Sequence, residues 1–200
     1  MARLTSVCVY CGSGFGTDPA FREAAATLGR DIAEAGLSLV YGGGNVGLMG
    51  TVAGAVLDHG GHVTGIIPDF LKSRERMLDA VQETIVVDDM HTRKKLMFDR
   101  ADAFVALPGG IGTLEELVEQ LTWAQLGQHT KPILLLSTNA FWAPLLTLLD
   151  HMRETGFLRA GLDPRYLVTE DVAQVIPLLR QAAAQQGEAP ERERLVAERF

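Results

Sequence analysis

Short apolar segments alternate with longer helix-like segments about seven times along this chain. We predict strands at residues 5–10, 37–41, 62–67, 84–87, 103–107, 132–136 and 166–168, and most of these are near-continuous apolar runs. We predict helices at 21–35, from the 42–50 loop to about 58, and at 90–100, 113–126, 141–155 and 172–184. Strands that are apolar on both faces belong to parallel sheets covered on both sides. The sequence therefore predicts an α/β fold, a doubly wound parallel sheet with helices on both faces.

Composition limits the size, location and partners of this fold. A chain of 200 residues with 47% apolar content favours one domain, which we assign to residues 1–184, followed by a charged C-terminal tail at 185–200. The net charge of -7 weighs against a nucleic-acid surface. No apolar run approaches the ~20 residues that span a bilayer, and the N-terminus lacks a signal-peptide layout. We expect a cytoplasmic protein with neither a nucleic-acid nor a membrane partner.

Cys8 and Cys11 form a C-x-x-C pattern, which is a weak signal for redox or metal chemistry on its own. Residues three apart on a strand point to opposite faces, so a disulfide would need a sharp bend at Tyr10. A second cysteine pair, which a zinc site of this type requires, is missing from the sequence. We predict two buried structural thiols and no metal site.

Three glycine-rich loops follow the predicted strands that end at Tyr10, Tyr41 and Leu107. The carboxyl ends of parallel strands lie at one edge of a sheet, so these loops are expected to gather there. The third loop reads Pro108-Gly-Gly-Ile-Gly-Thr-Leu-Glu-Glu116, and we predict a helix that opens at Thr113 with both glutamates in its first turn. Glycines and a helix N-terminus together favour phosphate binding. A carboxylate beside such a loop suggests chemistry on a phosphorylated sugar.

Other interpretations of the motifs are weaker. Gly42, Gly44 and Gly47 fit a dinucleotide-binding frame, but the acidic residue expected about 20 positions later would fall near Ile66. A P-loop motif is missing. Arg93 and its basic neighbours would ordinarily form a solvated helix face. Arginine also suits a phosphate or a carboxylate held through two contacts, and the start of its helix is expected at the edge of the glycine loops.

Three blocks, taken together, resemble the LOG family of cytokinin riboside 5′-monophosphate phosphoribohydrolases. Residues 108–116 reproduce the family's P-G-G-x-G-T-x-x-E signature, and residues 41–50 and 90–94 resemble its other two blocks. The similarity extends from about residue 7 to 168. The sequence departs from the family at Gly14, where many members carry a serine.

The resemblance implies a Rossmann-like fold, a homodimer and a nucleoside monophosphate substrate, without cofactor or metal. The implied reaction is hydrolysis of the N-glycosidic bond of N6-modified adenosine 5′-monophosphates, and of AMP, to free base and ribose 5-phosphate. Arg93 and Glu116 resemble the catalytic pair. The implied substrate-binding positions are Ser13, Gly43, Gly44, Met49, Glu75, Lys94, Gly109, Gly110, Ile111, Gly112, Thr113, Leu114, Glu115 and Thr122.

Several alternatives stay open at this point. A lysine decarboxylase commonly needs pyridoxal phosphate bound to a lysine, and none of the four lysines has a setting that suggests this chemistry. A nucleotide-binding or sensing protein without turnover would use the same glycine loops. The sequence does not decide whether Arg93 holds phosphate or positions Glu116, nor which base the enzyme prefers.

Overall fold

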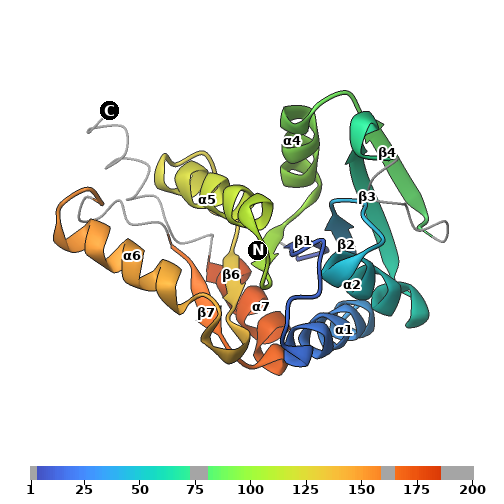
Figure 1. Ribbon diagram of the computed structural model, residues 1–200, viewed down its shortest axis with the longest axis horizontal. Helices are drawn as coiled ribbons and strands as arrows, with labels where there is room; N and C mark the ends of the chain where they lie inside the picture. Colours follow the sequence, from blue (N-terminus) through green and yellow to red (C-terminus); the bar gives the residue numbers. More distant parts are fainter. Residues whose placement is uncertain (1–3, 73–80, 159–164, 186–200) are drawn as a thin grey trace.

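The computed structural model describes residues 4–72, 81–158 and 165–185, and within them seven parallel strands form one sheet (Figure 1). The strands are β1 (Ser6–Tyr10), β2 (Ser38–Tyr41), β3 (His62–Pro68), β4 (Glu83–Val87), β5 (Ala103–Ala106), β6 (Ile133–Leu136) and β7 (Leu167–Thr169). Their order across the sheet is β4-β3-β2-β1-β5-β6-β7. Every predicted strand is present, with bounds within one residue of the prediction.

Helices cover both faces of this sheet (Figure 1). The helices are α1 (Pro19–Glu34), α2 (Gly47–Asp58), α4 (Met90–Arg100), α5 (Ile111–Gln125), α6 (Ala143–Glu154) and α7 (Val175–Gln185). Three short 3-10 segments, η1 (Asp69–Leu71), η2 (Thr138–Ala140) and η3 (Val172–Gln174), interrupt the connections. One buried cluster joins α1, α2 and α7 to the sheet, and a second joins α4, α5 and α6 to the opposite face. The doubly wound arrangement predicted from the sequence is confirmed.

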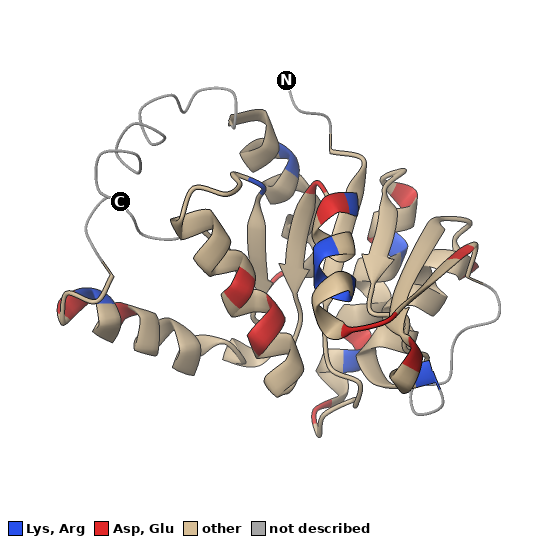
Figure 2. Cartoon of the chain, turned by 90° about the horizontal axis from the view of Figure 1, so that it is seen from above, with Lys and Arg blue, Asp and Glu red and all other residues tan. Residues whose placement is uncertain are grey.

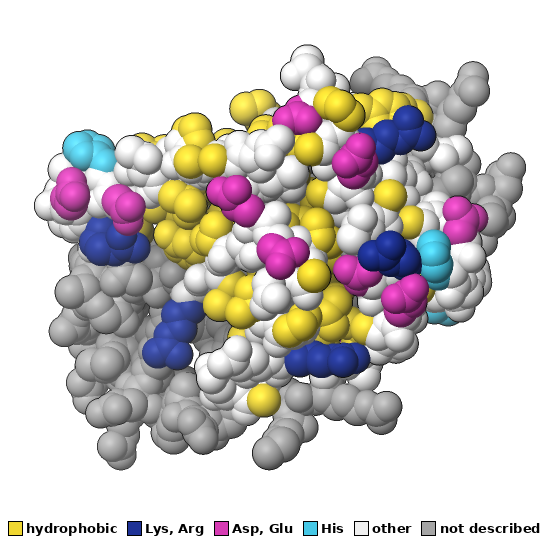
Figure 3. Space-filling model, turned by 90° about the horizontal axis from the view of Figure 1, so that it is seen from below, with side chains coloured by type: hydrophobic (Ala, Val, Ile, Leu, Met, Phe, Trp, Pro, Cys, Tyr) yellow, Lys and Arg dark blue, Asp and Glu magenta, His cyan; other side chains and the backbone are white. Residues whose placement is uncertain are grey.

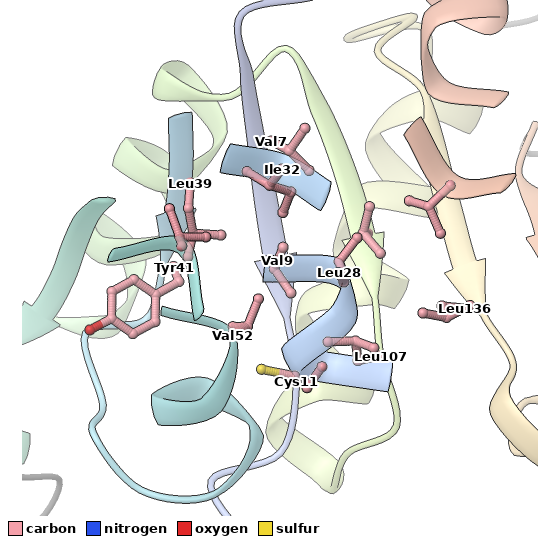
Figure 4. Close-up of a cluster of buried hydrophobic side chains, with 14 of the residues drawn as sticks. Val7, Val9, Cys11, Leu28, Ile32, Leu39, Tyr41, Val52, Leu107 and Leu136 are labelled. Carbon is pink, nitrogen blue, oxygen red and sulfur yellow. The ribbon is translucent and has the colours of Figure 1, made fainter. Parts of the chain in front are cut away.

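The central strand β1 contributes to both cores because its side chains alternate between the faces. Val7, Val9 and Cys11 pack with Leu28 and Ile32 of α1 in the first cluster (Figure 4). Each of these five residues is at most 6% exposed, and a parallel strand in this position is apolar throughout because both faces are covered.

Both cysteines are buried and carry free thiols, as predicted. Cys8 packs in the second cluster and Cys11 in the first, so their side chains lie on opposite faces of the sheet. Burial raises the pKa of Cys8 and of Cys11, which keeps both thiols protonated. Their role is therefore packing, as expected for buried, protonated thiols.

The strand order reverses direction at β1, which pairs with β2 on one side and with β5 on the other. In doubly wound sheets, ligands bind in the crevice outside the carboxyl ends of the strands at this reversal. The loops that leave β1 and β5 lie at that crevice, and the loop that leaves β2 lies one strand away.

The surface shown in Figure 3 has mixed charge: lysine and arginine side chains are separated by acidic and hydrophobic ones. None of the helices in the described ranges combines the length and apolar character needed to cross a bilayer. Glu75 and residues 186–200 of the predicted tail lie outside the described part of the chain.

Candidate active site

The three glycine-rich loops meet at one edge of the sheet, as the sequence predicts. The backbone N–H of Gly12, after β1, donates to the carbonyl of Pro108, after β5, over 3.1 Å. The N–H of Leu48, at the start of α2, donates to the carbonyl of Gly12 over 3.0 Å. These backbone contacts join the three loops into one surface at the strand-order reversal.

Gly109 lies where the first and third loops are closest. A Cβ atom at this position would lie 2.2 Å from Thr113 Oγ1 and 2.9 Å from the backbone nitrogen of Gly12. Real Cβ atoms do not approach other atoms this closely, so any side chain would push the two loops apart. Glycine at 109 is therefore required by close packing of the loops.

Helix α5 begins at Ile111, two residues earlier than predicted, and this moves the glutamates out of the first turn. Gly110 takes an extended conformation and serves as the N-cap, and its carbonyl accepts from the N–H of Leu114 over 3.0 Å. The first helical turn therefore contains Gly112 and Thr113, and Glu116 lies one turn further along. The prediction was wrong because helix propensity disfavours glycine inside a helix, whereas the first turn tolerates it.

The N-terminus of α5 has the features of an anion-binding site. The N–H groups of residues 110–113 have no partner within the helix, and no side chain of the described residues caps this end. Gly110 and Gly112 are exposed, and a Cβ atom at either would meet nothing within 4 Å. The helix dipole adds about half a positive charge at this point. A phosphate group has both room and donors here.

Arg93 and Glu116 form a buried ion pair beside this helix terminus. Arg93 is 6% exposed and Glu116 is 8% exposed. The guanidinium Nη1 lies 3.6 Å from the Glu116 Oε1, which is an ion-pair distance but too long for a direct hydrogen bond. The two residues that the resemblance implies to be catalytic are therefore together, although they are 23 positions apart in the sequence.

Backbone carbonyls at the ends of two strands fix the orientation of Arg93. Its Nε donates to the carbonyl of Ile66 in β3, and its Nη2 donates to the carbonyl of Gly42 after β2, each over 3.1 Å. A Cβ atom on Gly42 would lie 1.9 Å from that Nη2 atom, so glycine makes room for the guanidinium. With these donors engaged by the protein, Nη1 is directed at Glu116.

Lys94 makes a second set of ion pairs between α4 and α5. Its Nζ lies 2.5 Å from the Glu115 Oε1 and 3.1 Å from the Glu119 Oε1. Burial lowers the pKa of Lys94, but its hydrogen bonds to the two glutamates outweigh burial and leave that pKa raised. Figure 2 shows the basic segments of α4 in blue and the acidic segments of α5 in red. Lys94 and Glu115, both predicted substrate contacts, are thus engaged with each other.

The remaining predicted substrate-binding positions are distributed over three environments. Gly43, Gly44 and Met49 are buried along the second loop, and the Met49 N–H lies 3.4 Å from the carbonyl of Gly12. Ser13 is exposed on the first loop. Thr122 is exposed on α5, where its hydroxyl donates to the carbonyl of Val118 over 2.8 Å, three turns beyond the anion-binding end. Ser13, Gly43, Gly44 and Met49 therefore belong to the joined loops, whereas Thr122 does not.

Sequence reasoning missed an apolar pocket beside the joined loops. The pocket has a volume of about 260 Å³, and Phe15, Phe21, Phe141 and Leu48 contribute its apolar walls together with glycines of the first and third loops. Phe21 and Phe141 meet edge to face with ring centroids 5.6 Å apart. Phe141 is supplied from the start of the α6 region, 120 residues after Phe21, so local sequence carries no signal for it.

The described residues do not include a metal-binding cluster: within residues 4–72, 81–158 and 165–185, no three His, Cys, Asp or Glu side chains gather closely enough to hold an ion. The site is instead composed of backbone amides, one buried arginine and one buried carboxylate.

Sequence comparison relates this arrangement to proteins of known activity. The chain matches the family described as "Possible lysine decarboxylase" over residues 49–179. It is 50% identical over 157 residues to the Arabidopsis thaliana cytokinin riboside 5′-monophosphate phosphoribohydrolase LOG7, covering 78% of this chain and 72% of that protein. It is 46% identical to the corresponding phosphoribohydrolase of Rhodococcoides fascians, covering 88% and 89% of the two chains. The chain belongs to the LOG family.

Solved structures agree on the fold of this LOG family member. The Moco carrier protein from Chlamydomonas reinhardtii is 26% identical and superposes with a TM-score of 0.67, covering 92% of this chain and 99% of that one. The structure of TM1055 superposes with a TM-score of 0.68 at 23% identity, covering 89% and 99%. Its identity is too low to support more than a shared fold.

Family membership identifies the chain as an enzyme that hydrolyses N-glycosidic bonds, not as the decarboxylase of the family's description. Each of the four lysines contacts another group of the protein: Lys72 pairs with Asp69, Lys94 with Glu115 and Glu119, and Lys95 with Asp99, whereas Lys131 donates to the carbonyl of Phe98. A lysine that forms a Schiff base with a cofactor would need to be buried beside an open, cofactor-sized cavity at the loop surface. None of the four lysines meets both conditions.

Proposed function

We propose that this LOG family enzyme hydrolyses the N-glycosidic bond of N6-modified adenosine 5′-monophosphates and of AMP, releasing the base and ribose 5-phosphate. The observation that carries the proposal is the buried Arg93–Glu116 pair beside the uncapped N-terminus of α5. The names of the relatives support the choice of cytokinin nucleotides.

The 5′-phosphate docks on the N–H groups of residues 110–113. Several backbone donors and the helix dipole converge there, and the exposed glycines leave the approach open. Binding energy from the phosphate, which does not react, orients the ribose. This assignment makes nucleosides without phosphate poor substrates.

Glu116 acts at the anomeric carbon. As the N-glycosidic bond breaks, C1′ gains oxocarbenium character, and an ionised carboxylate stabilises that charge or activates water, as carboxylates do in glycoside hydrolysis. The guanidinium of Arg93, 3.6 Å away, holds the orientation of the Glu116 carboxylate. Because Arg93 also donates to two backbone carbonyls, we assign it to positioning Glu116 in preference to binding phosphate.

We further propose that the enzyme is a homodimer. Large apolar side chains are exposed along α5, whose first turn lies at the site: Ile111 is 81% exposed, Val118 is 42% exposed, and Leu126, the C-cap, is 41% exposed. Exposed apolar side chains in a row on one helix are typical of an interface. Sedimentation analysis of the protein tests the assembly, and a monomer at micromolar concentration would contradict it.

Base release measured by chromatography tests the proposed reaction. AMP and N6-isopentenyladenosine monophosphate are expected to yield free base, whereas adenosine and isopentenyladenosine are expected to react at least ~10²-fold more slowly, as follows when remote binding energy is lost. Equal turnover with and without the phosphate would contradict phosphate docking on α5. Tight AMP binding with no base release over hours would favour a binding protein without turnover.

A further inference from the structure

The connection between β6 and α6, residues 137–142, follows an uncommon backbone path. Asn139 and Ala140 have φ angles of 52° and 58°, and within the described ranges no other residue except glycine has a positive φ. A Cβ atom is disfavoured in this left-handed region, so two such residues in succession are unusual. Strained backbone of this kind persists only where surrounding contacts hold it, and it concentrates at functional sites.

The segment contacts the end of the first glycine loop. The Asn139 Nδ2 donates to the Oδ2 of Asp18 over 2.7 Å, and Asp18 is the N-cap at which that loop enters α1. The ring of Phe141 meets the ring of Phe21 edge to face, and a Cβ atom on Gly16 would lie only 2.9 Å from the Phe21 ring. Residues 137–142 therefore hold the first loop through one hydrogen bond and one aromatic contact.

The same segment contacts the start of the third glycine loop. The indole N–H of Trp142 donates to the carbonyl of Ala106 over 3.1 Å, and Ala106 is the last residue of β5, two positions before Pro108. Trp142 is 4% exposed, and its backbone N–H donates to the Ser137 Oγ over 2.9 Å. Loss of the indole donor would leave the Ala106 carbonyl buried and unpaired, which is costly.

We propose that residues 137–142 form a brace that sets the separation of the first and third glycine loops, with Asn139 and Trp142 as positioning residues for phosphate binding. The brace adds two anchors to the direct bond between the loops, from the N–H of Gly12 to the carbonyl of Pro108. The inference rests on the proposed function, because the third loop leads into the N–H groups that are assigned to the 5′-phosphate. Asn139 and Trp142 act through the loops.

A brace for the phosphate site has a kinetic signature that a general packing role lacks. Loops that are no longer held at the right separation bind the phosphate less well, so kcat/KM for AMP falls. Adenosine lacks the phosphate, so its slower turnover does not depend on these amides. Packing damage that spread through the whole site would instead lower both values by the same factor. The ratio of kcat/KM for AMP to kcat/KM for adenosine is therefore the quantity to measure.

Two substitutions each remove one anchor. Asn139→Gly keeps the left-handed backbone accessible and removes the donor to Asp18, whereas Trp142→Phe keeps an aromatic ring and removes the indole N–H. Each is expected to lower the ratio at least about fivefold, the scale of one hydrogen bond. Asp18→Ser retains a side chain that caps α1 and is expected to have the same effect as Asn139→Gly. The double variant is expected to lose no more than either single variant, because the two residues form one contact.

Ala140→Gly is the matched control. Ala140 is the next residue, is exposed and has the same left-handed conformation, so glycine fits there without strain. The ratio is expected to stay within about twofold of the wild type, and urea denaturation is expected to show unchanged or higher stability. A fall equal to that of Asn139→Gly would show that the flexibility of the segment matters and its contacts do not, which would overturn the proposal.

Titration calorimetry with ribose 5-phosphate gives a readout that does not depend on turnover. The Kd is expected to rise at least about fivefold in Asn139→Gly and in Trp142→Phe and to stay within about twofold in Ala140→Gly. Unchanged binding in the first two variants, shown by urea denaturation to be folded, would overturn the proposal. An equal loss of turnover with AMP and with adenosine would also overturn it.

Failure of the proposed function is distinguishable from failure of the brace. If the wild type binds ribose 5-phosphate but releases no base, the proposed reaction is wrong, and the binding series alone decides whether the brace positions the loops. A wild type that neither releases base nor binds ribose 5-phosphate would overturn both.

Discussion

Replacing Glu116 with glutamine removes a charge from the centre of the proposed site while preserving its shape. Glu116 is 8% exposed, and its Oε1 lies 3.6 Å from the guanidinium of Arg93, which also donates to two backbone carbonyls. The glutamine side chain still offers an oxygen to the guanidinium. The change leaves the buried Arg93 charge without its carboxylate partner, so we expect a loss of about 1–3 kcal/mol in the free energy of unfolding. That is well within the ~5–15 kcal/mol stability of a typical domain.

Turnover is expected to respond far more strongly than stability. If Glu116 stabilises the oxocarbenium-like transition state, Glu116→Gln lowers kcat by at least ~10²-fold, the scale of one catalytic group. That factor corresponds to about 2.7 kcal/mol in the activation barrier. Because the phosphate docks on backbone amides that the substitution leaves unchanged, KM is expected to change by less than about threefold.

Base release from AMP and from its N6-isopentenyl form, measured by chromatography over a range of concentrations, separates kcat from KM. Urea denaturation of the same preparations verifies that the variant is folded. Glu34→Gln on α1 is the matched control, because the Glu34 side chain is 62% exposed and remote from the loops. A folded Glu116→Gln enzyme with near-normal kcat would refute the role assigned to this carboxylate.

Three further predictions concern packing, pH and thiol reactivity. Gly42→Ala introduces a Cβ atom 1.9 Å from the buried guanidinium and is expected to lower kcat at least tenfold in the base-release assay, a scale consistent with the ~1–3 kcal/mol of an overpacked site, whereas Gly54→Ala, with nothing within 4 Å, retains activity. Burial raises the pKa of Asp102, but hydrogen bonds from Thr5 and Ser6 outweigh it and leave the pKa lowered in the fold. The stability that this provides is present above the unfolded pKa of ~3.9 and is lost as pH falls through the folded pKa, so Asp102→Asn is expected to flatten acid denaturation curves, and an unchanged slope would contradict this. Ellman's reagent is expected to leave both cysteines unmodified in the native protein and to label two thiols after unfolding, and rapid native labelling would show that they are accessible.

The elements of the fold were predictable because their signals are local. An apolar run such as residues 103–107 indicates a strand that is buried on both faces. A glycine-rich stretch directly after such a run indicates the turn at which the strand ends. The grouping of the loops also followed, since parallel strands place their carboxyl ends at one edge. The positions of Arg93 and Glu116 at this edge were therefore expected from the order of the elements.

The start of α5 was not predictable to the residue. Local propensity disfavours a helix through Gly112, but packing of Gly109 against the first loop and of Thr113 into the core starts the helix at Ile111. The consequence for the site is that the glutamates occupy the second turn, where Glu116 reaches Arg93.

What the sequence by itself determined is the set of groups available: seven buried strands, three glycine loops at one edge, and an arginine and a glutamate that follow two of those strands. Only the tertiary structure decided which groups pair. The guanidinium of Arg93 is oriented by the carbonyls of Ile66 and Gly42, and the ammonium of Lys94 by carboxylates on another helix. The physical reason is that a long charged side chain has many rotamers of similar energy, and its choice among them depends on partners brought close by folding.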